Sequence, residues 1–367
     1  MFDRRLVQYF DWGMLALTLV LAAIGVLTLY SAVVSGGETP QRILYIKQML
    51  WFGFGIMAMV ACFLFNYKTL DRWASVIYAA CILMLVAVLF FGKYVGGSRR
   101  WLDFGFVSLQ PSELIKLGLI IFLARYYSRM ATPKGFTLRQ LVTPIVLTLL
   151  PFALIVRQPD LGTAMLLLLI AGSMTVYMKI ERRSMITLVS AGAIAVPLVW
   201  FFLKGYQKRR ILTFLNPDRD PLGAGYHIIQ SKIAIGSGAV SGKGFLKGSQ
   251  NALEFLPEQH TDFIFSVLAE EWGFMGSMAI LLLFLLLIVW GLNIAASSRD
   301  PFGTVLAVGV TCMIFWQVFI NIGMVMGLMP VVGVPLPLIS YGGSSIVTIM
   351  MSIGLLINVS MRRFLFE

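Results

Sequence analysis

The sequence predicts an all-α integral membrane protein of about ten transmembrane helices, with a large extracytoplasmic loop between the seventh and the eighth. Two observations support this prediction. Hydrophobic residues make up 59% of the 367 positions and charged residues only 13%, a composition whose apolar surface a soluble domain of this length could not cover. Apolar runs long enough to cross hydrocarbon, about 20 residues each, also recur from one end of the chain to the other.

Ten apolar runs are the candidate spans, and two of them are marginal. The run that begins near residue 113 contains Glu113 and Lys116, and the fifth and sixth runs are separated only by residues 157–159. The first run is too long for the core of a signal peptide and lacks a convincing cleavage site, so we expect it to be retained. The runs cover residues 11–34, 46–65, 73–92, 113–128, 142–157, 160–178, 185–203, 263–292, 302–327 and 342–361.

The chain is expected to form one unit. Cys62, Cys81 and Cys312 all fall inside apolar runs, where they are interpreted as small core residues, so no disulfide framework or metal site is predicted. No repeat with a period of about 20–50 residues and no low-complexity linker divides the sequence. We therefore expect a single polytopic membrane domain over residues 1–367, with a large extracytoplasmic loop at 204–262.

The distribution of Lys and Arg predicts the orientation. Of the 29 basic residues, 14 lie in one set of short connecting segments and six in the opposite set. Eight more lie in the long segment 204–262, and long loops are exempt from the positive-inside rule. Both termini are therefore expected on the cytoplasmic side, and segment 204–262 is expected on the outer side.

The long outer segment is divided by charge. Residues 204–247 contain eight basic residues and two acids, whereas residues 251–262 contain three acids and no base. A cationic stretch beside an acidic one suits an anionic, pyrophosphate-like substrate that is held near a carboxylate. A solvated loop with ordinary surface charges explains the same composition equally well.

The glycine-rich run 236–244 is similar to a phosphate-binding P-loop but lacks its pattern. Ser237 stands where the first glycine is needed, Gly244 stands where Ser or Thr is needed, and no strand is expected before the run. A nucleoside-triphosphate site is therefore not expected. A flexible anion-binding turn and a plain hinge are the remaining interpretations, and the hinge is favoured.

Glu113 and Lys116 are the charged pair inside a predicted span. They are three residues apart, on one helical face, at the outer end of an apolar run. Each charge alone would cost about 2.5–3.5 kcal/mol near a helix centre, so we expect the two to pair. A functional role, which includes gating a conformation, is favoured over a purely structural one.

Two Gln-Pro motifs, at residues 110–113 and 158–160, open spans from the outer side. Proline at the first helical position and an acid in the first turn are typical of an ordinary helix start. In the functional alternative, Asp160 faces inward at a tight outer turn.

Residues 255–263 lead directly into a long apolar run. Asp262 suits an N-cap, where aspartate is favoured, and Glu270 and Glu271 are candidates for buried network partners about two turns further on. His260 and the other histidine of the chain, His227, have no third ligand nearby. Neither a metal site nor a Ser-His-Asp triad is therefore supported.

Together these motifs identify the chain as similar to the SEDS family, and the resemblance runs nearly end to end. One departure is Ala239, where the family usually has another glycine, in a turn. The motifs are Arg99-Arg100-Trp101, Gln110-Pro111-Ser112-Glu113 with Lys116, Gln158-Pro159-Asp160-Leu161-Gly162-Thr163-Ala164, Gly236-Ser237-Gly238 with Gly242-Lys243-Gly244, Phe255 to Phe263, and Pro337-Leu338-Ile339-Ser340-Tyr341-Gly342-Gly343-Ser344-Ser345.

The resemblance implies ten transmembrane helices and a peptidoglycan glycosyltransferase of the bacterial inner membrane. Its substrate would be lipid II, the undecaprenyl-pyrophosphate-linked disaccharide peptide, polymerised into glycan strands. Asp262 matches the family's essential aspartate, and Glu113 with Lys116 matches its intramembrane salt bridge. The short N-terminal tail and the residues 259–262 favour the members that act in cell elongation over those that act in division.

The resemblance also implies partners. These are a class B penicillin-binding transpeptidase, elongation proteins of the MreC and MreD type, and membrane lipid, with no nucleic acid. No cofactor is certain, and a divalent cation, Mg²⁺ or Mn²⁺, would be an optional aid to the pyrophosphate. The other candidate site residues are Arg100, Trp101, Gln110, Ser112, Gln158, Asp160, Arg210, Lys232, Lys243, Glu258, Ser340, Gly342, Gly343 and Ser344.

The chemistry of such a transfer needs a single carboxylate. A glycosidase uses two because its leaving alkoxide must be protonated, whereas a pyrophosphate leaves as a stable anion. One base, Asp262, and cations from Arg210, Lys232 or Lys243 would then suffice. Two other classes fit the same features: a lipid II flippase, because many spans and buried charges suit a transporter, and a non-catalytic scaffold for the transpeptidase.

Overall fold

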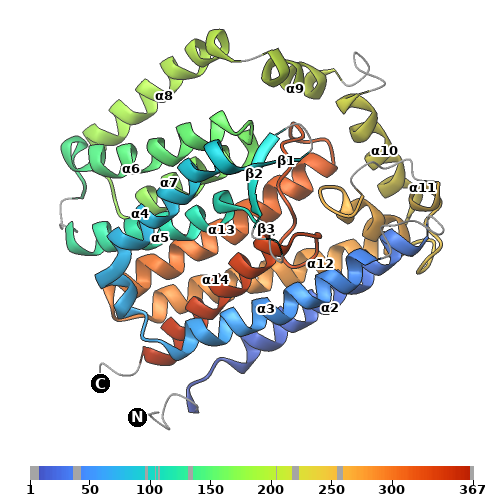
Figure 1. The fold of residues 1–367 in the computed structure, drawn as a ribbon, viewed down its shortest axis with the longest axis horizontal. Helices are drawn as coiled ribbons and strands as arrows, with labels where there is room; N and C mark the ends of the chain where they lie inside the picture. The colour runs from blue at the N-terminus through green and yellow to red at the C-terminus, as the bar shows by residue number, and fades with distance from the viewer. Residues whose placement is uncertain are drawn as a thin grey trace.

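The computed structural model of the chain describes residues 8–35, 43–95, 98–103, 105, 108–130, 135–203, 205–216, 223–253 and 259–363. In these parts long helices form a bundle, and a small antiparallel three-stranded sheet lies near one end of it (Figure 1). The start of the first long helix and the last turn of the final helix meet at the other end. There the Ser360 hydroxyl donates to the Asp11 carboxylate over 3.3 Å.

Each predicted apolar run coincides with a helix in the described part of the chain. The helix bounds extend past the runs where polar residues continue the helical turn, as residues 68–72 do at one start. The helices are α2 (Trp12–Val34), α3 (Leu44–Leu64), α4 (Lys68–Phe91), α5 (Pro111–Met130), α6 (Leu138–Arg157), α7 (Leu161–Tyr177), α8 (Arg182–Phe202), α12 (Ile264–Ser297), α13 (Pro301–Val325) and α14 (Gly343–Arg362).

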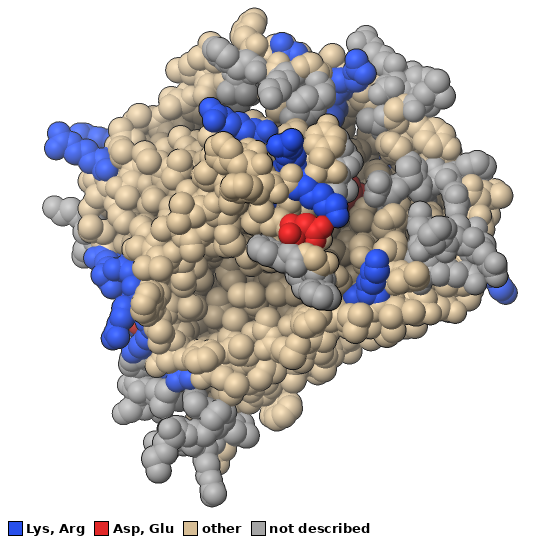
Figure 2. Space-filling model, in the orientation of Figure 1, with Lys and Arg blue, Asp and Glu red and all other residues tan. Residues whose placement is uncertain are grey.

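Seven helices in the described residues are long and apolar enough to cross a membrane, namely α2, α3, α4, α6, α12, α13 and α14. The marginal run near residue 113 became α5, which carries Glu113, Lys116, Arg125 and Arg129 within its 20 residues. The sixth run became α7, which has only 17 residues. The chain is a multi-pass membrane protein, and most of the face in Figure 2 is accordingly uncharged, with Lys and Arg prevailing among its charged side chains.

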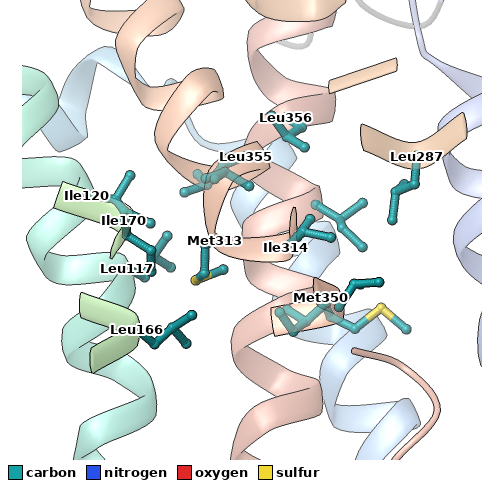
Figure 3. Close-up of a cluster of buried hydrophobic side chains, with 14 of the residues drawn as sticks. Leu117, Ile120, Leu166, Ile170, Leu287, Met313, Ile314, Met350, Leu355 and Leu356 are labelled. Carbon is teal, nitrogen blue, oxygen red and sulfur yellow. The ribbon is translucent and has the colours of Figure 1, made fainter. Parts of the chain in front are cut away.

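The core surrounds α13 and α14, whose side chains are mostly buried. Figure 3 shows Met313 of α13 beside Leu117 of α5 and Ile170 of α7, with Leu355 of α14 above it in this view. α13 contacts α5, α7, α12 and α14, so it lies at the centre of the packed helices.

Segment 204–262, which was predicted as a loop, contains three helices in its described parts. They are α9 (Gly205–Leu215), α10 (Ala224–Ser237) and the short α11 (Ser249–Ala252). α10 packs on α12, and α9 packs on α10. The connection predicted as a large loop is therefore partly helical, because amphipathic stretches in it, such as α9, form helices.

The sheet precedes α5 at the same end of the molecule as α10. It consists of β1 (Lys93–Val95), β2 (Ser98–Asp103) and β3 (Ser108–Leu109), with antiparallel pairing of β1 to β2 and of β2 to β3. The Lys93 ammonium and the Asp103 carboxylate pair over 2.7 Å across it. The hydrogen bond from Lys93 lowers the pKa of Asp103 below its usual value.

The helix α12 is broken at Gly273, whose φ of 64° and ψ of −161° are not helical. The turn 238–244 fills the break: the amides of Phe274 and Met275 donate to the carbonyls of Ala239 and Val240 over 2.9 and 3.1 Å. In return the amides of Lys243 and Gly244 donate to the carbonyls of residues 270 and 271 over 3.1 and 2.9 Å. The break thereby separates a short first segment, 264–272, from the rest of α12.

Candidate functional site

The segment 259–262 is tied to several distant elements. The Gln259 side chain donates to the Ala32 carbonyl at the end of α2 over 3.1 Å, and the His260 carbonyl accepts from the Tyr341 amide over 2.9 Å. Burial raises the pKa of Tyr341 above its ordinary value, so its hydroxyl stays neutral. These two bonds join the start of α12 to α2 and to the segment before α14.

The next two residues are held equally closely. The Ser340 hydroxyl donates to the Thr261 carbonyl over 2.6 Å and accepts from the Leu336 amide over 2.8 Å. The amide nitrogen of Asn321, on α13, donates to the Asp262 carbonyl over 3.0 Å and to the Val334 carbonyl over 2.8 Å. Four successive residues are thus fixed from α2, α13 and the segment before α14, which defines the backbone position of Asp262.

The proline-rich turn 330–337 borders the Asp262 carboxylate. Gly333 has φ +73°, and a Cβ on it would lie 3.3 Å from Oδ2 of Asp262. On its other side the turn contacts α7, because a Cβ on Gly162 would lie 2.3 Å from the Val332 carbonyl oxygen. The half-buried Asp262 therefore faces a backbone surface that glycine keeps open to close approach.

A second polar cluster lies where α5 and α7 begin. The Gln110 side chain donates to the Ser112 hydroxyl over 3.0 Å and lies 3.5 Å from the Asp160 carboxylate. The Gln110 amide donates to the Ser344 hydroxyl over 3.0 Å. Asp160 also accepts from the amide and hydroxyl of Thr163 over 3.2 and 3.0 Å, so it caps α7 as the helix-start interpretation predicts.

The Gln158 turn is fixed from two sides. Arg100 on β2 donates to the Gln158 carbonyl over 3.2 Å and to the Pro159 carbonyl. The Gln158 side chain donates to the Leu85 carbonyl of α4 over 3.1 Å. Ser344 contacts this cluster, and Ser340 contacts the Asp262 segment. Because the two serines lie only four residues apart in the chain, the cluster and the Asp262 segment lie close together.

The other predicted residues, just before α14 and at its start, lie in the same part of the molecule. The Gly342 amide lies 3.4 Å from Oε1 of Gln48, whose amide nitrogen donates to the Ser340 carbonyl over 3.0 Å. Gly343 packs so closely on Trp51 that a Cβ would lie 2.1 Å from the indole ring. Trp101 lies on β2 opposite Lys93.

The intramembrane pair is formed as expected. The Lys116 ammonium lies 2.8 Å from each oxygen of the Glu113 carboxylate, and the side chains are only 1% and 4% exposed. A bidentate, desolvated pair of this kind satisfies both charges inside α5.

Glu270 and Glu271 are buried network members, as predicted. The Lys243 ammonium lies 2.6 Å from the Glu270 carboxylate, which also accepts from the Gln250 amide over 3.0 Å. Glu271 accepts from the Ser31 hydroxyl of α2. These contacts hold the glycine turn and α11 against the first segment of α12.

The three cationic candidates lie in different surroundings. Lys232 on α10 is exposed and lies against Gly327, just after α13, where a Cβ would be 2.8 Å from its nitrogen. Lys243 faces Glu270, and Arg210 lies on α9, which packs on α10. Glu258 lies outside the described residues.

Sequence reasoning missed several residues of this site, above all Asn321, Gln48 and Gly333. Asn321 is a polar residue near the outer end of an apolar span, and that position was a usable signal. The partners of Gln48 and Gly333 are set by tertiary contacts, which the sequence does not display. No group of three His, Cys, Asp or Glu that would hold a metal ion occurs among the described residues.

The arrangement brings the Asp262 carboxylate, the turn 330–337 with Gly333, and the exposed Lys232 to one end of a membrane bundle. The carboxylate suits proton abstraction, and the lysine suits an anionic leaving group. The fixed backbone of 259–262 provides the preorganisation that such a base requires.

Comparison with known proteins finds matches over nearly the whole chain. Residues 11–364 match the family model for the cell cycle proteins FtsW, RodA and SpoVE. The chain is 43% identical over 357 residues to the peptidoglycan glycosyltransferase MrdB of Escherichia coli K12, which covers 97% of this chain and 94% of the relative.

Solved structures show the same architecture. A chain from a peptidoglycan synthase complex, described for its coordination of polymerization and crosslinking, superimposes with a TM-score of 0.82 at 32% identity. The rod shape determining protein RodA of Thermus thermophilus superimposes with a TM-score of 0.72 at 28% identity. Each comparison covers 97% of this chain and 98% of the other.

Proposed function

This chain belongs to the FtsW, RodA and SpoVE family of cell cycle proteins and is a peptidoglycan glycosyltransferase, and from that premise we propose that Asp262 is its catalytic base. The observation that carries this proposal is the fixed position of Asp262. Its backbone is held by α13 and its carboxylate borders the glycine of the turn 330–337. The segment before α14 fixes the neighbouring residue.

In the proposed reaction, Asp262 takes the proton from the 4-hydroxyl of the acceptor GlcNAc. The acceptor oxygen forms a bond to C1 of the donor MurNAc with inversion, and the bond from C1 to the pyrophosphate oxygen breaks. Undecaprenyl pyrophosphate leaves as an anion, so no second carboxylate is needed to protonate it. The product is a glycan strand that is longer by one disaccharide-peptide unit.

The negative charge that develops on the leaving pyrophosphate has to be stabilised by a cation. Lys232 is the preferred candidate because it is exposed on α10, beside the turn that follows α13. Lys243 already faces Glu270, so its role is to hold the first segment of α12, and Arg210 on α9 is an outer contact for the donor. Mg²⁺ or Mn²⁺ is an optional aid, carried by the pyrophosphate.

The cluster of Gln110, Ser112, Asp160 and Ser344 is proposed to bind the sugar part of a substrate. Its amide, hydroxyl and carboxylate groups suit sugar hydroxyls, and Gln158 and Arg100 hold the turn beneath it. Trp101, Gly342, Gly343 and Glu258 complete the proposed site. The Glu113 and Lys116 pair is proposed to fix the start of α5 in the active conformation.

The number of spans, their orientation and the membrane in which they lie are also proposals. We infer ten spans in one domain over residues 1–367, in the bacterial inner membrane, with both termini cytoplasmic and residues 204–262 outside. The shared end of α2 and α14 supports an even number of crossings. The likeness to a complex described for polymerization and crosslinking supports a class B penicillin-binding transpeptidase as partner, and the family resemblance adds membrane proteins of the MreC and MreD type.

The test is polymerisation of labelled lipid II by the purified chain, fused to its transpeptidase partner. Asp262→Asn keeps the shape of the side chain and should abolish long glycan products, because the proton acceptor is lost. Asp103→Asn, an exposed acid on the sheet, is the matched control and should leave the rate unchanged. Undiminished polymerisation by folded Asp262→Asn would remove the base assignment, whereas transbilayer movement of lipid II without polymer would favour a flippase.

A further inference from the structure

An apolar pocket lies between α6, α7 and α8, in the half of these helices that is away from Asp160. Its volume is about 330 Å³, and its walls include Leu141 and Leu149 of α6, Gly172 of α7 and Met185 of α8. This volume is at the lower end of the range of about 300–1,000 Å³ that is usual for small-molecule sites. A helix, about 10–12 Å across with its side chains, would not fit.

The pocket exists because α8 barely packs on its neighbours. Among the described side chains of α8, Ser184 is buried and Leu188 is half-buried, while the others are exposed. The corner before α8 is nevertheless fixed, because residues 136 and 180 form a backbone bridge between two connections. α8 therefore starts at a fixed corner and leaves an apolar space beside α6 and α7.

Basic residues lie around the end of the pocket at this corner. Arg139 lies two residues before Leu141, and Arg182 and Arg183 lie two or three residues before Met185. All three arginines are exposed, and Lys179 lies beside the pocket residue Ile180. Against these four cations, the described residues 135–139 and 179–183 contain one acid, Glu181, so their net charge is positive.

We propose that this pocket binds one anionic phospholipid. Arg139, Arg182 and Arg183 contact its phosphate, and one acyl chain lies in the pocket. Basic pockets between transmembrane helices recognise anionic headgroups in this way. The site is separate from the proposed reaction, because Leu141 and Gln158 are 17 residues apart, about 25 Å along a helix. A pyrophosphate held near Asp262 would not reach these arginines.

The ligand test uses the purified full chain in detergent, titrated with dioleoyl phosphatidylglycerol or with dioleoyl phosphatidylcholine. Binding to the folded state raises the melting temperature. We expect a saturable rise with phosphatidylglycerol and one retained lipid in native mass spectrometry, and no saturable rise with phosphatidylcholine. Equal rises with both lipids would overturn the proposal, because they would indicate a non-selective lipid shell.

A pocket-filling variant tests the location. Gly172→Leu places a side chain in the pocket, and a Cβ there has no atom within 4 Å, so the substitution fits the fold. Gly53→Leu on α3 is the matched control, because Gly53 has equally open surroundings and lies outside the pocket. The phosphatidylglycerol effect should vanish in Gly172→Leu and persist in Gly53→Leu. Persistence in both variants would overturn the proposed location.

Charge variants test the headgroup contact. Arg182→Gln with Arg183→Gln should weaken phosphatidylglycerol binding about fivefold for each charge, the effect expected for one basic residue near an anionic lipid. Arg72→Gln with Arg299→Gln removes two exposed arginines away from the pocket and should leave binding unchanged. Equal weakening in both double variants would overturn the site. Displacement of the retained phosphatidylglycerol by undecaprenyl pyrophosphate would assign the pocket to the substrate instead.

Discussion

The backbone of Asp262 depends on one amide group, the side chain of Asn321. Its nitrogen donates to the Asp262 carbonyl and to the Val334 carbonyl, and the side chain is fully buried. The two acceptors belong to the segment 259–262 and to the turn that borders it. Loss of this donor would therefore move the proposed base relative to the surface it faces.

We predict that Asn321→Asp lowers kcat for lipid II polymerisation about 100-fold with little change in KM, because small misplacements of a catalytic group have effects of this size. The substitution keeps the shape and removes the two donors. The matched control is Asn358→Asp, because Asn358 is buried at the other end of the molecule and also donates to two carbonyls, those of Cys62 and Phe65.

The control variant should lose less thermal stability, because Arg362 donates to the side-chain oxygen of residue 358, and it should keep its specific activity. An equal loss of kcat in both variants would show that Asn321 acts through stability alone. Asn321→Asp with wild-type kcat would remove its positioning role.

Variants of the Glu113 and Lys116 pair give a second prediction at the scale of single residues. Lys116→Met leaves a buried carboxylate without a partner and should cost about 3–5 kcal/mol of stability. The double variant Glu113→Leu with Lys116→Met removes both charges and should recover most of that loss in a thermal unfolding assay. Its polymerisation rate should stay below that of the wild type if the pair also has a functional role, and full activity would assign it to stability alone.

At the scale of elements, the break in α12 depends on glycine. Gly273 has φ +64°, and a Cβ on it would lie 2.3 Å from the Gly242 nitrogen and 2.7 Å from the Val240 carbonyl oxygen. A side chain there would force the turn 238–244 off the helix, and with it the contacts of Lys243 to Glu270.

We therefore predict that Gly273→Ala destabilises the protein by at least about 1–3 kcal/mol, the usual cost of a non-glycine residue in strained backbone. Gly53→Ala on α3 lies in open surroundings and should be neutral or stabilising by up to about 1 kcal/mol. Melting temperatures of the two variants in one detergent compare these costs. A wild-type melting temperature for Gly273→Ala would show that the turn does not depend on the break.

The helices could be predicted from the sequence, but their connections could not. The length of the apolar runs and the polar residues that flank them define the bounds of α2 and α13 to within a few residues. The reason is that the thickness of the hydrocarbon core sets the length of a membrane-spanning helix. The helices α9 and α10 were not predicted because they are short and contain no continuous apolar run of the length that crosses a membrane. The break at Gly273 was missed because glycine within an apolar helix is common, and only its partner turn distinguishes this one.

The candidate site could be predicted only in part for a similar reason. Asp262, Ser340 and Asp160 lie in short motifs of unusual composition, so local sequence marks them. The bond from Asn321 to Asp262 joins residues 59 positions apart, and the bond from Gln259 reaches back to Ala32 over 227 positions. Such pairings depend on helix packing, which neither periodicity nor composition specifies.

For the whole molecule, the orientation can be measured by labelling. A cysteine introduced at Asn216, after α9, should react with a membrane-impermeant maleimide in intact cells. A cysteine at Ser297, at the end of α12, should react only after the membrane is permeabilised. Both positions are exposed, and the natural cysteines lie within helices. The opposite labelling pattern would reverse the proposed topology.

The four bonds that fix residues 259–262 also set an order for biosynthesis. Two of the groups that hold this segment, Ser340 and the Tyr341 amide, belong to the part of the chain that leaves the ribosome after α13. A nascent chain that ends with α13 still lacks both groups. The proposed base Asp262 therefore reaches its final position only after the segment before α14 has been made, so we expect a nascent chain that ends with α13 not to polymerise lipid II.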